Sequence, residues 1–151
     1  MPKVRANGID LYYETHGRGE PLLLIAGLGA TCELWDNQVP LLARKFQVIT
    51  FDNRGAGRSD KPQEPYSVAL FADDTAGLMD ALSLDSAFVY GESMGGLIAQ
   101  EFGVRHPQRA RALVLGCTTF GGPKSVPLRP EAASALSSTE STGTEAAMER
   151  R

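Results

Sequence analysis

Hydrophobic and polar residues follow one another in blocks that have the lengths and periods of strands and helices. Residues 3–15 alternate around Asn7-Gly8, a two-residue turn signal, and predict a β-hairpin. A continuous apolar run at residues 22–26 and largely apolar segments at 46–51, 87–90 and 112–116 follow, and they are typical of buried strands. The pattern therefore predicts a hairpin followed by buried strands.

Helical periods fill the intervals between these strands. Residues 67–82 predict a helix, and Asp73, Asp74 and Asp80 lie off its mainly apolar stripe. The stripe comprises Phe71, Thr75, Leu78, Met79 and Leu82. Residues 31–44 predict another helix, kinked by Pro40. Trp35 could line a substrate pocket, but we expect it to be a core anchor. A third helix starts near Met94 and stops before Pro107.

This order of elements predicts an α/β fold. Strands that alternate with helices form a mostly parallel sheet with helices on both faces, here after an antiparallel hairpin. Residues 3–120 hold this pattern, whereas residues 121–151 are rich in Gly, Pro, Ser, Thr and Ala, and Thr142-x-x-Glu145 predicts a helix start. The last strand has no successor, so we expect an incomplete sheet whose apolar edge could support self-association.

Composition narrows the classes of function. The 151 residues are 42% hydrophobic with a net charge of −3, which argues for a globular protein and against nucleic acid as the partner. The longest apolar run, residues 22–26, is too short to cross a membrane, and no signal-like segment follows the N-terminus. Cys32 and Cys117 suit free, buried thiols, so we expect a cytoplasmic protein without a metal site.

The most informative motif is Gly91-x-Ser93-x-Gly95, which lies between an apolar strand and an apolar helix. This is the pattern of a nucleophile elbow, a turn so tight that the serine adopts a strained backbone and its neighbours must be small. The serine hydroxyl then projects from the carboxyl edge of the sheet. An ordinary strand-to-helix turn is the alternative reading.

Three segments in order make the chain resemble the α/β-hydrolase superfamily: residues 24–29, residues 51–60 and the elbow around Ser93. Within it, the chain looks similar to the esterase and 3-oxoadipate enol-lactonase group. The resemblance covers residues 3–120, the amino-terminal half of such a domain. It implies that residues 121–151 begin a cap, or are a truncated tail.

The resemblance also implies a chemistry. Ser93 would be the nucleophile of an ester or lactone hydrolase that works through an acyl-enzyme and needs no cofactor. The backbone N–H groups of Leu28 and Met94 would form the oxyanion hole. Ala26 stands where the family often has a histidine that braces this loop, so we expect the loop to be held differently.

The acid and base of a catalytic triad are missing. No aspartate follows Ser93, and His106 lies 13 residues later, about 20 Å away along a helix. His16 is expected at the opposite edge of the sheet. The chain alone should therefore be inactive or very weak, as a truncated hydrolase. A non-catalytic binding protein and a half-protein that needs a partner chain are the alternatives.

Charged residues crowd the loop after the strand at 46–51. Asp52, Arg54, Arg58 and Asp60 could bind a charged substrate, but we expect them to lock the loop through hydrogen bonds and ion pairs. Ser59 suits a turn. Gly55-x-Gly57 lacks the rest of a dinucleotide fingerprint, which argues against a phosphate site.

Overall fold

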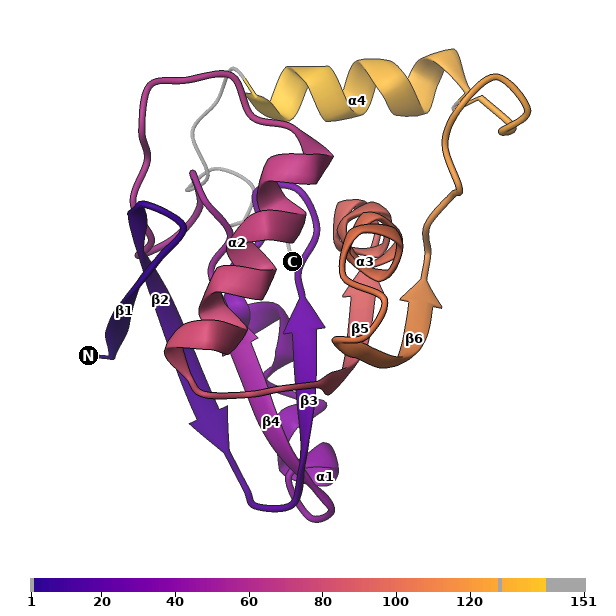
Figure 1. Ribbon diagram of the computed structural model, residues 1–151. Coiled ribbons are helices and arrows are strands. Elements are labelled where there is room, and N and C mark those ends of the chain that lie inside the picture. Colours follow the sequence, from indigo (N-terminus) through magenta and orange to yellow (C-terminus); the bar gives the residue numbers. More distant parts are fainter. Residues whose placement is uncertain (1, 128, 141–151) are drawn as a thin grey trace. The chain divides into compact units, whose positions relative to one another are not determined.

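The computed structural model describes residues 2–127 and 129–140 (Figure 1). These residues form a six-stranded sheet in the order β1-β2-β4-β3-β5-β6. The strands are β1 (Lys3–Ala6), β2 (Ile9–His16), β3 (Glu20–Ile25), β4 (Phe46–Phe51), β5 (Ala87–Glu92) and β6 (Ala110–Gly116). β2 pairs antiparallel with β1 and β4, and the other neighbours are parallel, so the predicted α/β sheet is confirmed.

The helices are η1 (Cys32–Trp35), α1 (Val39–Leu42), α2 (Val68–Ala81), α3 (Met94–Arg105) and α4 (Pro130–Glu140). Figure 1 shows α2 and α3 side by side on one face of the sheet and α1 on the other. The chain divides into two compact units at Phe120–Gly121, and α4 belongs to the second. No helix in the described residues is long and apolar enough to cross a membrane.

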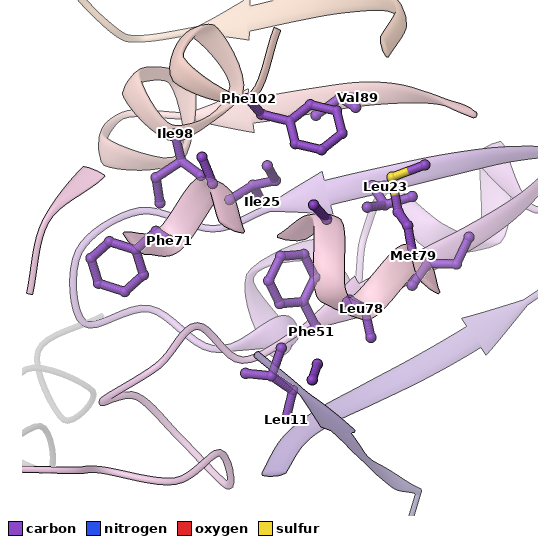
Figure 2. Close-up of a cluster of buried hydrophobic side chains, with 14 of the residues drawn as sticks. Leu11, Leu23, Ile25, Phe51, Phe71, Leu78, Met79, Val89, Ile98 and Phe102 are labelled. Carbon is purple, nitrogen blue, oxygen red and sulfur yellow. The ribbon is translucent and has the colours of Figure 1, made fainter. Parts of the chain in front are cut away.

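The larger core lies between the sheet and the pair α2 and α3 (Figure 2). Leu11, Leu23 and Phe51 come from three neighbouring strands, and all are at most 1% exposed. The helices contribute fully buried side chains that meet them, among them Leu78, Met79, Ile98 and Phe102. The period-2 and period-3.6 patterns of the sequence converge on this layer.

A smaller cluster covers the opposite face. Trp35 is fully buried with Leu24 and Val48, and its ring lies 5.1 Å from that of Tyr90. The predicted core role of Trp35 is therefore confirmed. Because η1 and α1 pack here while α2 and α3 pack on the other face, both faces of the sheet carry helices.

The predicted helix at residues 31–44 is wrong in its continuity. The segment forms the 3-10 helix η1 and then, after a turn, the four-residue α1. Pro40 occupies the first turn of α1, where its missing N–H is not needed. The proline thus helps to start a second helix and does not kink a single long one.

Two further predictions need correction. Asp74 was placed off the apolar stripe of α2, yet it is 1% exposed, since an arginine from the loop after β4 reaches it. Cys117 is exposed, while Cys32 is buried as expected. α4 occupies residues to which the sequence assigned no helix, and the capping box at Thr142 lies outside the described residues.

The described sheet ends at β6, as the sequence predicted. β6 pairs with β5 on one side, and no strand of the described residues pairs with its other side. Leu113, Val114 and Leu115 are 37%, 55% and 45% exposed. Because successive side chains point to opposite faces, apolar surface is uncovered on both faces of this strand.

Candidate active site

Ser93 occupies the turn between β5 and α3. Its backbone has φ 55° and ψ −118°, a conformation that costs a non-glycine residue about 1–3 kcal/mol. The residue is exposed, and its hydroxyl makes no hydrogen bond within the described part of the chain. A strained, exposed and unpaired serine at the carboxyl end of a parallel strand is the geometry expected of an elbow.

The flanking glycines make this turn possible. A Cβ on Gly91 would lie 2.1 Å from the carbonyl oxygen of Gly95. A Cβ on Gly95 would lie 2.0 Å from the carbonyl oxygen of Ile25. Both contacts are with backbone atoms, which cannot swing aside as a side chain can. The two glycines therefore let α3 start directly against the ends of β3 and β5.

The loop after β3 lies next to the serine. A Cβ on Gly27 would be 3.2 Å from Cβ and 3.7 Å from Oγ of Ser93. The side chain of Leu28 is 58% exposed, and Met94 is half-buried against the larger core. Their roles as backbone donors stay a prediction. The two segments predicted to carry the donors nevertheless flank one hydroxyl.

Asn53 holds the loop after β3 at Ala26, where the sequence predicted that the loop would be held differently. Its Nδ2 donates to the carbonyl oxygen of Ala26 over 3.0 Å, and the side chain is buried. The spacing of residues in the sequence did not identify Asn53 as a site residue. The only signal was its place directly after Asp52, at the carboxyl end of a strand that neighbours β3.

Side chains of the loop after β4 stabilise the loop itself. The buried Asp52 carboxylate accepts hydrogen bonds from the backbone N–H of Cys32 (2.7 Å) and of Arg58 (2.8 Å). The Ser59 hydroxyl donates to the Asp52 carbonyl and accepts from the Tyr12 N–H. These contacts confirm the predicted locking role of the loop and the turn role of Ser59.

Arg54 fastens the same loop to α2. Its guanidinium, with a side chain only 4% exposed, donates twice to Asp74, over 2.7 and 2.8 Å. This hydrogen bonding is the main reason why the pKa of Arg54 is raised. Arg54 also pairs with Glu64, which lies in the same loop. The guanidinium therefore joins the loop both to α2 and to itself, and its carboxylate partners are not Asp52 or Asp60.

Neither histidine lies near Ser93. His106 caps the far end of α3 and pairs with Asp73 over 3.1 Å. His16, at the end of β2, is in register with Val48 and pairs with Glu14 over 3.1 Å. Sequence reasoning placed both correctly but missed their carboxylate partners, because both pairs depend on packing between side chains.

The Glu14 carboxylate is the centre of a second polar cluster. Tyr12 donates its hydroxyl to Glu14 over 2.6 Å, which lowers the pKa of Glu14 and raises that of Tyr12 to about 12. Burial, with smaller effects from nearby carboxylates, raises the pKa of Cys32 to about 12. The cluster borders a cavity of about 230 Å³ that does not include Ser93.

Comparisons with known proteins identify the fold. Residues 20–139 match the family model described as alpha/beta hydrolase fold. The "Putative carbamate hydrolase RutD" of Azorhizobium caulinodans is 40% identical over 115 residues, which are 76% of this chain and 43% of that protein. The chain thus spans less than half the length of this relative.

Two solved structures of hydrolytic enzymes have a similar fold. Est816, an N-acyl homoserine lactone degrading enzyme, has a TM-score of 0.77 at 34% identity, over 90% of this chain and 52% of its own. The enol-lactonase of Burkholderia xenovorans LB400 has a TM-score of 0.76 at 34% identity, over 78% of this chain and 47% of its own. This chain therefore belongs to the α/β-hydrolase fold family.

Proposed function

We propose that this chain carries the nucleophile of a serine hydrolase that cleaves an ester or lactone through an acyl-enzyme on Ser93. The observation that carries the proposal is the backbone of Ser93, held at φ 55° and ψ −118° with an exposed, unpaired hydroxyl. Strain of this kind persists where surrounding structure enforces it, and it is concentrated at functional sites.

In the proposed reaction the Ser93 oxygen attacks the substrate carbonyl carbon. The negative charge that forms on the carbonyl oxygen is stabilised by the N–H groups of Leu28 and Met94. The ester or lactone C–O bond then breaks, and the alcohol oxygen takes up the proton that the base removed from Ser93. Water later attacks the acyl carbon, so that the acid is released and a proton of the water returns to the serine oxygen. One oxyanion donor of this kind is worth about 100- to 1000-fold in rate.

The base that takes the serine proton comes from outside this sequence. Its two histidines are His16 and His106, and both are paired elsewhere. A base acts from about 3 Å, whereas His106 is about 20 Å from Ser93 along α3. An imidazole would therefore have to come from another polypeptide segment. The chain by itself should hydrolyse substrate very slowly.

The substrate class rests on the relatives. Two structural neighbours are named for lactones, and the RutD relative is named for carbamates. Esters, lactones and carbamates all present an acyl carbonyl to a serine. We take a small ester or lactone as the substrate, with a carbamate as the second candidate and with no role for nucleic acid, membranes or a cofactor. The cytoplasm is the compartment we propose.

Free imidazole can test the nucleophile by supplying the missing base. We expect a fluorophosphonate probe to label Ser93 slowly, and added imidazole to accelerate the labelling. Peptide mass spectrometry would locate the modification, which Ser93→Ala should abolish. Ser83 is a control within the same molecule, because it is also exposed and has φ 56° but lies at the end of α2.

Equal labelling of Ser83 and Ser93, with or without imidazole, would refute the proposal. It would favour the alternative of a non-catalytic binding protein, which the engaged state of both histidines supports. A half-protein completed by a partner chain would instead show an active Ser93 that responds to imidazole.

A further inference from the structure

The two backbone polar groups of Ser93 are held by the strand next to the elbow and by the residues that follow it. The Ser93 N–H donates to the carbonyl oxygen of Gly116 over 2.9 Å. The Ser93 carbonyl oxygen accepts the Thr118 hydroxyl over 2.7 Å, and it also accepts the Gly96 N–H over 3.0 Å. Gly116, at the end of β6, therefore binds the N–H of the strained residue, and Thr118, two residues later, binds its carbonyl oxygen.

Gly96 leaves space for the Thr118 side chain, and Gln100 holds the segment that follows β6. A Cβ on Gly96 would lie 2.5 Å from Cβ and Cγ2 of Thr118 and 2.6 Å from its Oγ1. The absence of that side chain lets Thr118 reach the first turn of α3. The Gln100 amide donates to the carbonyl oxygens of Gly96 and Thr119, over 3.0 and 2.8 Å. Gln100 thus connects the segment after β6 to α3 through hydrogen bonds.

We propose that Thr118 is a positioning residue for the nucleophile: its hydroxyl fixes the Ser93 peptide and so keeps the Ser93 side chain directed at the substrate. The inference rests on the proposed function of Ser93. In this proposal Thr118 acts only through Ser93 and does not contact the substrate. Misplacement of a reacting group by about 1 Å can reduce a rate about 100-fold, so one peptide hydrogen bond can matter.

Three proteins test the proposal: the wild type, Thr118→Val and Thr118→Ser. Valine keeps the shape of threonine without its hydroxyl, while serine keeps the hydroxyl. We expect Thr118→Val to speed amide exchange of Gly96 and Ser93 by about tenfold, the size of one hydrogen bond. Its maximal rate of fluorophosphonate labelling at saturating probe should fall by a similar factor in imidazole. The half-saturating probe concentration should stay unchanged.

Thr118→Ser should restore both measurements. If Thr118→Val left exchange and labelling unchanged, or if Thr118→Ser lost as much as Thr118→Val, the hydroxyl would have no positioning role and the proposal would fall. Failure of the proposed function looks different, because an unlabelled wild type would refute the nucleophile. Amide exchange would then decide alone whether Thr118 holds the bend.

Discussion

At the scale of single residues, backbone contacts that leave no room for a side chain decide the geometry of the turn at Ser93. Gly95 is held against the end of β3, and Ser93 is bent over it. Pattern reading found both residues, because small residues around a serine between strand and helix form a local signal. It did not find Thr118 or Asn53, whose hydrogen bonds depend on how separate strands end side by side.

The Gly95→Ala variant should lose much of its stability. The new Cβ would lie 2.0 Å from the Ile25 carbonyl oxygen, and only a shift of α3 or β3 can relieve the contact. We expect a loss of about 3 kcal/mol or more in the free energy of unfolding, measured by urea denaturation. Gly8→Ala is the control. Its Cβ meets nothing within 4 Å at φ 81°, so only backbone strain of about 1–2 kcal/mol remains. Equal losses would contradict the packing argument.

The two cysteines should differ in reactivity. The thiolate is the form that alkylates, and the pKa of Cys32 is raised to about 12, chiefly by burial. Iodoacetamide at mildly alkaline pH should therefore modify the exposed Cys117 and leave Cys32 intact in the folded protein. Mass spectrometry would read this out, with urea-unfolded protein as the control in which both react. Rapid modification of Cys32 in the native state would show that this site opens.

At the scale of elements, the loops at the carboxyl edge of the sheet are held by side chains that reach into neighbouring elements. Arg54 connects the loop after β4 to α2, and Asn53 connects it to the loop after β3. The charges of this loop were visible in the sequence, but the partner of Arg54 was not. Asp74 belongs to a helix face that the periodicity had assigned to solvent. The sequence thus predicted the elements well and the connections between them poorly.

Breaking the pair of Arg54 and Asp74 should be costly. Arg54→Met keeps much of the length of the side chain but leaves the buried carboxylate of Asp74 without its cation. We expect a loss of about 3–5 kcal/mol in the free energy of unfolding, followed by circular dichroism in urea. The control Arg5→Met removes an exposed pair with Asp10 and should change stability by less than about 1 kcal/mol. Similar losses would show that burial of the pair is unimportant.

At the scale of the whole molecule, β6 is an edge that could pair with a second copy of itself. Its outer backbone groups are free of strand partners within residues 2–127 and 129–140, and apolar side chains emerge on both of its faces. Two identical edges can meet about a twofold axis as antiparallel strands. We therefore expect the protein to associate at high concentration.

Val114→Lys tests this expectation. A lysine on an edge strand disfavours pairing with another strand, so the variant should remain monomeric in sedimentation velocity at concentrations where the wild type associates. Leu41→Lys is the matched control. It replaces a leucine that is 64% exposed on α1, a helix that packs against β4, and should associate like the wild type. A wild type that stays monomeric at all concentrations would rule out self-association through β6.

The bend at Ser93 has a consequence for how such a chain could change over evolutionary time. Glycine adopts φ 55° without steric penalty, so Ser93→Gly would relieve the backbone strain and remove the proposed nucleophile. The replacement that is easiest for the backbone is therefore the one that would end the proposed chemistry. If Ser93 is the nucleophile, a lineage freed from selection for hydrolysis should drift toward glycine at this position, whereas selection for hydrolysis should keep the strained serine.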